Sequence, residues 1–566
     1  MMPMSGGRPS KRLVAWLTGC QGGRGMALGG LALFLLAFVL YLPTLGYDYT
    51  LMDDYGLIVE NEVFLSNPSS ILGAFALDPY GAPGTMYRPG LTLSLMLDRS
   101  WSGRSPWGYH LTNVLIHSGC CLLLFLLLNL LGGSPALAWA LSAWFTVHPA
   151  LVPAVAWIPG RNDTLLAMWL MASLIAWLKF SARPGGIWLA VHWIAGGLAL
   201  LTKETALFFP ILGAALAWRN RRRLDGLRGL AGPALGWTLI IGGWAVLRNL
   251  AASGQSGIQL IGAIDLIKGL AGYIGKIALP VRLGAIPLPE GIGLWIGVAT
   301  VGLTAVLIVS VGLRSRLLFG YGLAWLLLGL APNAFTSTDY PNFLEHRLYL
   351  PMVGVAVMAL GVRPLPVVVR HRRITGFLLA FFLAGLAAIS LARSGHYRDR
   401  HRFWGYAVET SPSLYYAHDM LGKVRLQDGD LEGARSSFEQ AIRQNPGYHH
   451  GYNNLAVALG LLGETDRAIS ALEKALVIRP DDVQTIMNLG AVKRQTGDLS
   501  GAAGLYQRAL ALDPLNHQAW NDLGTIWYTL GQPDSALSCF EKALALSPRD
   551  PSYQSNYRAV KQRLVR

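Results

Sequence analysis

Two adjacent carboxylates, Asp53 and Asp54, follow closely on the first long apolar run of the chain, in the sequence Met52-Asp53-Asp54-Tyr55. Acidic side chains held at the edge of a membrane are candidate functional groups. A carboxylate that is partly shielded from water beside a second carboxylate has a raised pKa, which suits a general base. An Asp-Asp pair is also typical of a solvated turn or a helix cap. We predict that Asp53 or Asp54 accepts a proton in catalysis, and these residues alone leave open which one does so.

Several cations and further carboxylates are predicted on the same side of the membrane as this pair. The predicted phosphate-binding residues are Arg88, His148, Arg161, Lys203, His346 and Arg347, and the supporting carboxylates are Asp163, Glu204 and Glu345. A single arginine at the end of an apolar helix is commonplace, because its side chain reaches out to water. Many such groups together indicate a site that binds an anionic headgroup and moves a proton. A lipid phosphate is the expected anion, since it arrives from the bilayer and matches arginine.

The elements that must position these side chains are membrane-spanning helices. The chain has 566 residues, of which 52% are hydrophobic and only 14% charged, so it is too apolar for an ordinary soluble protein. Eleven apolar segments are expected to span: 26–46, 110–131, 135–157, 162–180, 186–202, 204–218, 230–248, 293–313, 317–333, 345–362 and 374–392. Backbone groups in lipid must bond internally, and these runs lack the alternation of barrel strands, so we predict helices.

The net charge of +15 lies in short basic clusters between apolar runs, which is typical of membrane topology and not of nucleic-acid binding. If the eleven segments alternate, these clusters fall on one side, which is therefore predicted to be cytoplasmic, together with an N-terminal segment at 1–25. The opposite side receives an outer loop at 47–108, the candidate site residues and everything after about residue 393. The stretch 258–289 is moderately apolar but charged, and we predict that it is interfacial or re-entrant.

A repeat begins near residue 412. Prolines recur at intervals of 34 residues, at Pro412, Pro446, Pro480, Pro514 and Pro548, and each interval contains Gly, Ala and aromatic or Leu residues at fixed positions. This pattern is the tetratricopeptide signature. The predicted fold is all-α, with a membrane domain at 26–395 and a repeat domain at 396–566. Predicted acceptor-binding residues are Asn453, Asn454, Asn488 and Asn521, although these asparagines are equally typical of helix ends or solvated positions.

The four cysteines have neither a paired framework nor a metal-ligand spacing, so no metal site is predicted.

Seven short motifs, taken in order and followed by the repeats, resemble the transmembrane and tetratricopeptide repeat-containing O-mannosyltransferases and their bacterial relatives. They are Met52-Asp53-Asp54, Tyr87-Arg88-Pro89, 107–113 with His117, Val147-His148-Pro149, 156–163, 201–204 and 345–351. The chain departs from the eukaryotic pattern at Met52, where an aromatic residue is usual, and at Glu345-His346-Arg347, where Glu-Arg-Tyr is usual.

The resemblance implies a GT-C glycosyltransferase fold, a polyprenyl-phosphate donor of mannose or a similar sugar, a Ser or Thr hydroxyl acceptor, and no metal or cofactor. It also implies that the catalytic carboxylate is Asp53 or Asp54, with the first acidic position the usual one. We expect a single displacement at the anomeric carbon, in which this carboxylate takes the acceptor proton. The departing phosphate would be held by Arg161, Lys203, His346 and Arg347.

Two alternatives remain. One is a ligase that transfers a preassembled glycan from a lipid pyrophosphate, and the other is a membrane-anchored scaffold whose repeats gather partners for envelope assembly. The number of apolar segments and the charges spread over the outer face favour an enzyme. The expected location is the plasma (inner) membrane, with the N-terminus cytoplasmic, the repeats outside, and the bilayer, the lipid-linked sugar and an extended protein acceptor as partners. No nucleic-acid partner is expected.

Overall fold

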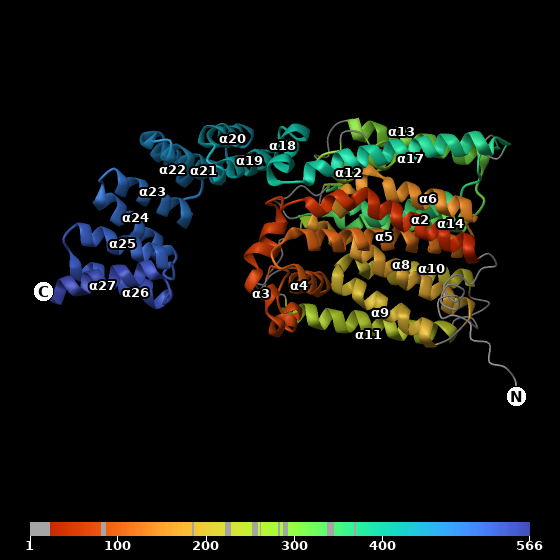
Figure 1. Cartoon of the computed structure of the whole chain (residues 1–566), viewed down its shortest axis with the longest axis horizontal. Coiled ribbons are helices and arrows are strands. Elements are labelled where there is room, and N and C mark those ends of the chain that lie inside the picture. The colour runs from red at the N-terminus through yellow and green to blue at the C-terminus, as the bar shows by residue number, and fades with distance from the viewer. Residues whose placement is uncertain are drawn as a thin grey trace. The chain divides into compact units, whose positions relative to one another are not determined.

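The computed structural model describes residues 23–80, 86–183, 186–220, 228–251, 259–260, 262–280, 283–286, 292–336, 344–366 and 370–565. The chain divides into two compact units, Met1–Tyr406 and Ala407–Arg566. Figure 1 shows that each unit is built of helices. Within the ranges above, the only strands are β1 (Gln259–Leu260) and β2 (Phe335–Thr336), which pair antiparallel. The predicted all-α fold is confirmed.

The first unit is a bundle in which α5 packs against α2 and α8, α8 against α9, and α14 against α15. Its helices are α2 (Gly23–Tyr41), α3 (Glu62–Ser66), α4 (Pro89–Ser102), α5 (Pro106–Leu130), α6 (Pro135–Val147), α7 (Val152–Ala156), α8 (Arg161–Ala182), α9 (Gly186–Thr202), α10 (Phe209–Asn220), α11 (Arg228–Ala251), α12 (Ala263–Ala278), α13 (Ile292–Val311), α14 (Arg316–Leu330), α15 (Tyr349–Leu360) and α17 (Arg372–Ser394). Short 3-10 helices join several of them, including η6 (Ile158–Gly160), η7 (Glu204–Phe208) and η10 (Glu345–Leu348). Prolines start α4, α5 and α6, where the missing N–H has no helical partner to lose.

Six helical segments among the described residues are long and apolar enough to cross a membrane, or seven if the bent pair Pro135–Val147 and Pro149–Ala156 is one span. They are Arg24–Gly46, Pro106–Leu130, Ile158–Ala182, Ala231–Ala251, Leu294–Val311 and Arg373–Tyr397. Counting the bent pair as one, seven of the eleven expected spans are therefore among these candidates. The other four segments do fold as helices, but α9 has 17 residues and α10, α14 and α15 have fewer. At 1.5 Å per residue, 17 residues cover about 26 Å, less than the roughly 30 Å of a hydrocarbon core.

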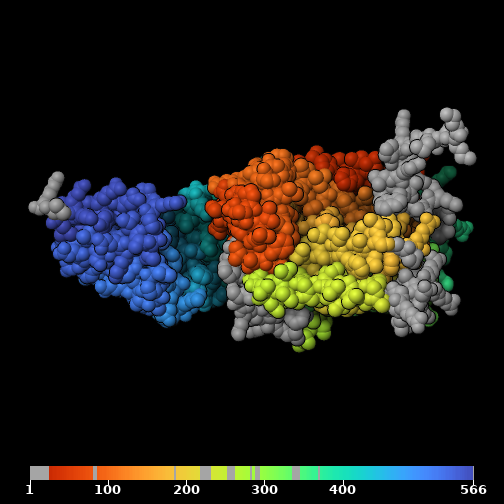
Figure 2. Space-filling view, turned by 90° about the horizontal axis from the view of Figure 1, so that it is seen from below, coloured from red at the N-terminus to blue at the C-terminus, as the bar shows by residue number. Residues whose placement is uncertain are grey.

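Three of the candidate spans expose most of their apolar surface. The most apolar windows of α11, α13 and α17 are only 17%, 6% and 11% buried. Figure 2 shows α11 as a continuous strip on the surface of the first unit. Apolar helices so exposed are stable only against lipid, and the chain is a multi-pass membrane protein. The prediction for 258–289 rests partly on residues outside the described ranges; within them α12 is not among the candidate spans.

The second unit consists of paired helices. They are α19 (Tyr415–Gln427) with α20 (Leu431–Gln444), α21 (His449–Leu461) with α22 (Thr465–Ile478), α23 (Val483–Gln495) with α24 (Leu499–Leu512), and α25 (His517–Thr529) with α26 (Pro533–Leu546), followed by α27 (Pro551–Val565). Gly429, Gly463, Gly497 and Gly531 end the first helix of each pair at φ between 76° and 86°, which only glycine adopts freely. Gly422, Gly490 and Gly524 instead lie close to the aromatic rings of Phe438, Tyr506 and Phe540.

The division between the units lies eleven residues beyond the predicted boundary at 395/396. Helix α18 (Arg400–Thr410) begins in the first unit, where Phe403 and Trp404 are buried. The indole N–H of Trp404 donates to the backbone carbonyl of Thr50 at 2.9 Å. Residues 396–406 therefore complete the first unit. Of the predicted cytoplasmic segment, 1–22 lie outside the described residues.

Candidate functional site

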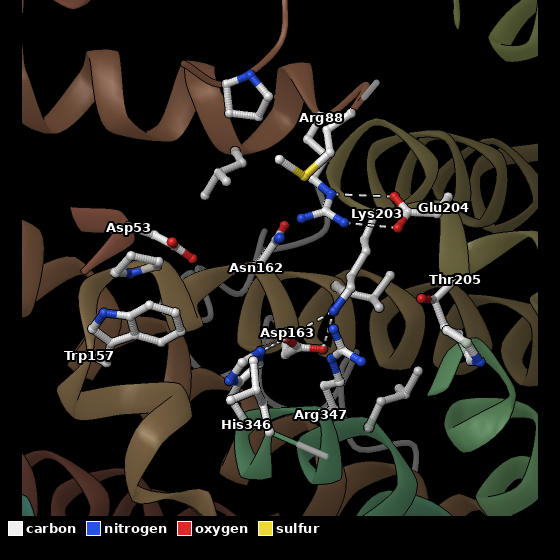
Figure 3. Close-up of a pocket in the computed structure, with 18 of the residues that line it drawn as sticks. Asp53, Arg88, Trp157, Asn162, Asp163, Lys203, Glu204, Thr205, His346 and Arg347 are labelled. Atoms are coloured by element: carbon white, nitrogen blue, oxygen red, sulfur yellow. Dashed lines mark hydrogen bonds and ion pairs between the residues drawn. The ribbon is translucent and has the colours of Figure 1, made fainter. Parts of the chain in front are cut away.

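A cavity of about 720 Å³ lies in the first unit, near the start of α4, the start of α8 and the end of α9. Its walls also include the segment around Asp53 and parts of η10 and α14. Seven of the predicted site residues line it: Asp53, Arg88, Asp163, Lys203, Glu204, His346 and Arg347. Figure 3 shows Asp53 entering from one side, beside Trp157, with Lys203, Glu204 and Thr205 on the other. Residues from five separate segments of the sequence thus meet at one pocket.

Asp53 and Asp54 have different environments. Asp53 lines the cavity, whereas Asp54 is buried and its carboxylate accepts hydrogen bonds from Thr50 N (2.6 Å), Thr50 Oγ1 (2.9 Å) and Met52 N (3.0 Å). These bonds close a tight turn whose second residue, Leu51, has a φ of 60°. A non-glycine residue in this region is strained, and the surrounding contacts must hold it there. Asp54 therefore shapes the turn, and Asp53 is presented to the pocket.

The carboxyl group of Asp53 has a raised pKa. Burial is the main cause of the rise to about 6, the neighbouring Asp54 carboxylate adds to it, and the guanidinium of Arg88 partly opposes it. A carboxylate with such a pKa is mostly ionised near neutral pH and is a stronger base than an ordinary aspartate. Asp53 is thus suited to accept a proton inside the cavity.

Arg88 lies on the upper wall of the pocket in Figure 3 and forms a two-point ion pair with Glu204. Its Nη2 donates to Glu204 Oε1 at 2.8 Å and its Nε donates to Oε2 at 3.3 Å. With its amide turned to suit its neighbours, Asn162 accepts from Arg88 Nη1 at 2.8 Å and donates to the carbonyl of Thr202 at 3.0 Å. The planar guanidinium is therefore held in a fixed orientation at the edge of the cavity.

A second polar group lies across the pocket, made of the cations Lys203 and Arg347 and of His346, whose pKa burial lowers to about 3, so that its ring is neutral. Lys203 Nζ donates to both oxygens of Asp163, at 2.8 and 3.0 Å. His346 Nε2 lies 3.9 Å from Asp163 Oδ2, and Arg347 Nη1 donates to Asn333 Oδ1 at 2.9 Å. Cations already oriented by neighbouring carboxylates and amides need little rearrangement to receive an anion. Lys203, His346 and Arg347 therefore offer a site for a phosphate.

Arg161 does not line the cavity, and its contacts do not favour the predicted role in binding the donor phosphate. Its side chain is fully buried and its Nη1 lies 2.5 Å from Asp98 Oδ2. It also donates from Nε to Asn113 Oδ1 (2.7 Å), from Nη2 to the carbonyl of Tyr109 (2.7 Å), and from Nη1 to the carbonyl of Ser94 (3.3 Å). These partners lie on α4 and α5. Arg161 fastens the start of α8 to both helices and so holds the wall of the pocket.

Glu345 and His148 also have structural contacts and do not line the cavity. Glu345 is buried between Lys276, at 2.8 Å, and Arg393, which donates to its other oxygen. His148 is buried, and its Nε2 donates to the carbonyl of Ile277 at 3.0 Å. Glu345 anchors η10, the short helix that presents His346 and Arg347. The sequence placed both residues on the correct face of the bundle but could not show that their side chains turn away from the pocket.

The predicted acceptor-binding asparagines lie in the second unit and link successive repeats. Asn454 donates to Asp419 at 2.7 Å, and Asn488 donates to Asn453 at 2.8 Å. Asn556 in turn donates to Asn521 at 2.8 Å. Each amide has further hydrogen-bonding capacity. Acceptor binding by these residues stays a prediction.

Several residues that matter to the site were not predicted from the sequence. Trp157, Asn162 and Asn333 line the cavity, and Asp98 and Arg393 are the buried partners of Arg161 and Glu345. Trp157 and Asn162 lie within the motif 156–163, so the motif itself was the available signal. Among the described residues, no three His, Cys, Asp or Glu side chains are grouped as metal ligands would be.

Comparisons with known proteins bear on both units. The tetratricopeptide repeat family matches residues 420–483 and 487–551. Protein O-mannosyl-transferase TMTC2 of Homo sapiens is 30% identical over 181 residues, which cover 30% of this chain and 21% of that protein. Protein O-mannosyl-transferase Tmtc1 of Drosophila melanogaster is 32% identical over 178 residues, covering 30% of this chain and 20% of that one. The matched part is thus about a fifth of the length of these relatives.

A longer match covers more than half of the chain. Protein O-mannosyl-transferase TMTC4 of Homo sapiens is 24% identical over 423 residues, covering 62% of this chain and 56% of that protein. A crystal structure of MamA covers 26% of this chain and 88% of that one at 22% identity, but its TM-score of 0.25 is too low to support an argument. This chain is a multi-pass membrane protein with C-terminal tetratricopeptide repeats, and it is similar in sequence to the protein O-mannosyl-transferases.

Proposed function

We propose that this chain is a membrane glycosyltransferase that moves one sugar, mannose or a similar hexose, from a polyprenyl phosphate to a Ser or Thr hydroxyl of a protein. The observation that carries the proposal is the position of Asp53. Its carboxyl group, with a pKa of about 6, shares one cavity with Arg88, Lys203 and Arg347. A base and an anion site facing the same space are what transfer from a phosphate to a hydroxyl requires. The names of the relatives support the same reaction.

In the proposed step the acceptor hydroxyl loses its proton to Asp53 as its oxygen bonds to the anomeric carbon. The bond from that carbon to the phosphate oxygen breaks, and the electron pair leaves with the polyprenyl phosphate. A single displacement of this kind inverts the anomeric configuration. The leaving phosphate carries its own charge, so it needs stabilising cations and not an acid. We assign that role to Arg88, Lys203 and Arg347, with the neutral ring of His346 as a hydrogen-bonding neighbour of the phosphate, and the step as written requires no metal or cofactor.

The cavity favours a single sugar over a preassembled glycan. A volume of about 720 Å³ is within the range of roughly 300–1,000 Å³ that is usual for sites of small ligands. A hexose, its phosphate and the acceptor side chain fit such a site, whereas a lipid-linked oligosaccharide would have to extend outside it. The ligase alternative is therefore less well supported. A scaffold has no need of a base that faces three cations across a cavity.

The repeats are proposed to hold an extended segment of the acceptor protein through the amides of Asn453, Asn454, Asn488 and Asn521. Side-chain amides recurring along a solenoid suit a peptide backbone, whose donors and acceptors also recur. The proposed location is the plasma (inner) membrane, with the cavity and the repeats on the non-cytoplasmic side. The basic clusters support this orientation provided that the four shorter apolar helices cross the bilayer as well, so that all eleven segments alternate.

The test is transfer by the purified full chain in lipid nanodiscs. Radiolabelled polyprenyl-phosphate mannose and polyprenyl-pyrophosphate glycan are supplied separately with a Ser/Thr-rich peptide. The proposal expects labelled peptide from the monophosphate donor, in a linkage released by alkali. Labelling only from the pyrophosphate donor would support the ligase. No transfer from either donor, by protein that still binds the peptide, would support the scaffold.

A further inference from the structure

The turn that presents Asp53 is held by hydrogen bonds from a segment far along the chain. Three hydrogen bonds join residues 47–50 to residues 394–404. Tyr47 Oη lies 3.1 Å from Ser394 Oγ, Asp48 N donates to the carbonyl of Arg398 at 2.8 Å, and Trp404 Nε1 donates to the carbonyl of Thr50 at 2.9 Å. The last of these bonds reaches the residue directly before the strained Leu51.

Trp404 is well placed to hold this turn. Its side chain is fully buried and packs edge to face on Phe403, with ring centroids 5.1 Å apart. Thr50 is also buried, so no water competes for its carbonyl. A strained backbone persists only when its surroundings over-determine it. Asp54 binds the N–H and the hydroxyl of Thr50, and Trp404 binds its carbonyl, so all the polar groups of Thr50 have partners.

We propose that Trp404 is a positioning residue for Asp53, acting through the carbonyl of Thr50. Its indole N–H fixes the plane of the peptide between Thr50 and Leu51, and this plane sets the direction in which Asp53 points. Without that bond the turn can relax out of the left-handed conformation at Leu51 and carry Asp53 out of the cavity toward water. The inference rests on the proposed function for its effect on turnover, but not for its effect on the environment of Asp53.

The test uses Trp404→Phe in the full chain, which keeps an aromatic ring and removes the N–H donor. Trp177→Phe is the matched control, because Trp177 is equally buried on α8 and its N–H has no hydrogen-bond partner among the described residues. Both proteins are compared with the wild type for sugar transfer and for melting temperature in detergent between pH 4 and 8. Each measurement is repeated with Asp53→Asn added.

We expect Trp404→Phe to lower kcat by about 10-fold, as one lost hydrogen bond of roughly 1.4 kcal/mol would. The KM for the lipid donor should stay within about two-fold, and the acid limb of the kcat profile should move to lower pH as Asp53 becomes more exposed. Trp177→Phe should do neither. In the melting series, Asp53→Asn should raise the melting temperature of the wild type above pH 6 and raise that of Trp404→Phe clearly less.

The proposal would be overturned if Trp404→Phe lost stability but kept the pH profile of kcat, and if Asp53→Asn still raised its melting temperature as much as it does in the wild type. Trp404 would then be a packing residue only. A wild type without transfer activity would refute the proposed function, and the melting series would still decide the position of Asp53. Equal pH shifts in Trp404→Phe and Trp177→Phe would also overturn it.

Discussion

Asp54 accepts two hydrogen bonds from Thr50, one from the backbone N–H at 2.6 Å and one from the hydroxyl at 2.9 Å. This relationship separates the two carboxylates of the acidic pair. Asp54 is used in holding the turn, while Asp53 lines the cavity with a pKa near 6. Substitutions at the two positions should therefore have different consequences.

Asp54→Asn should destabilise the protein more than Thr50→Val. Both oxygens of Asp54 accept from backbone N–H groups. An asparagine turns its NH₂ toward one of these donors, which leaves a buried N–H unsatisfied at a cost of about 1–3 kcal/mol. Thr50→Val removes one hydroxyl bond, for about 1 kcal/mol. Thermal melting in detergent measures both. A Thr50→Val protein less stable than Asp54→Asn would contradict the arrangement of the turn.

Asp53→Asn should stabilise the protein above pH 6. The fold raises the pKa of Asp53 from 3.8 to about 6, so the fold favours the protonated carboxyl. The favourable contribution of Asp53 to the free energy of unfolding is fully present below about pH 3.8 and is lost as the pH rises through 6. Asparagine carries no charge, so Asp53→Asn should be more stable than the wild type by roughly 1–3 kcal/mol at pH 7. The gain should vanish near pH 4. A variant less stable than the wild type at pH 7 would show that the carboxylate is favourably bound.

Arg161→Met should impair folding and not donor binding. It leaves Asp98 buried without its cation, and breaking a buried ion pair costs about 3–5 kcal/mol. Adding Asp98→Leu should recover much of that loss, because a hydrophobic pair can replace a buried ion pair. The comparison is Arg347→Gln, which should raise the KM for the lipid donor with little change in melting. If the Arg161→Met protein were stable and had a raised KM for the lipid donor, Arg161 would be a phosphate-binding residue after all.

Gly524→Leu should destabilise the repeats, since a Cβ at Gly524 would lie 2.9 Å from the ring of Phe540. Overpacking of this kind costs about 1–3 kcal/mol. Gly504→Ala is the matched control within a repeat helix, because no atom lies within 4 Å of its added Cβ, and it should leave stability unchanged or slightly increased. Circular dichroism melting of residues 407–566 distinguishes the two. Equal melting temperatures would mean that the helices of the last pair do not pack as described.

The repeats should be accessible from the non-cytoplasmic side. Gln532 is exposed directly before α26, the second helix of the fourth repeat. Gln532→Cys, in a chain with Cys20 and Cys539 replaced by serine, should react with an impermeant maleimide applied to that side. Reaction only after the membrane is permeabilised would reverse the proposed orientation.

Much of the fold was predictable because it depends on periodicity. The 34-residue spacing from Pro412 to Pro548 located the repeats, and each apolar segment folded as one helix or as two successive helices. Length was less predictable: α14 and α15 stop after 15 and 12 residues, and the sequence did not show where packing partners would end them. The roles of Gly429 and Gly524 also differ, one allowing a positive φ and the other close packing, although both recur with the same period.

The candidate site was predicted only in part, for a geometric reason. The order of the segments places Arg88, Lys203 and Arg347 at one end of the bundle, and the structure brings them to one cavity. The direction of each side chain around its helix or turn depends on distant partners. Arg161 forms an ion pair with Asp98, and Asp54 accepts a hydrogen bond from Thr50. Neither pairing follows from a motif.

The most direct test of the account is transfer of sugar from polyprenyl-phosphate mannose to a Ser/Thr peptide by wild type, Asp53→Asn and Arg347→Gln proteins in nanodiscs. Removing the base should lower kcat by roughly 10²- to 10⁴-fold at saturating donor, with the protein folded. Arg347→Gln should retain more activity at saturating donor, because its main effect is on donor binding. Full turnover by Asp53→Asn would contradict the central claim that Asp53 accepts the proton of the acceptor.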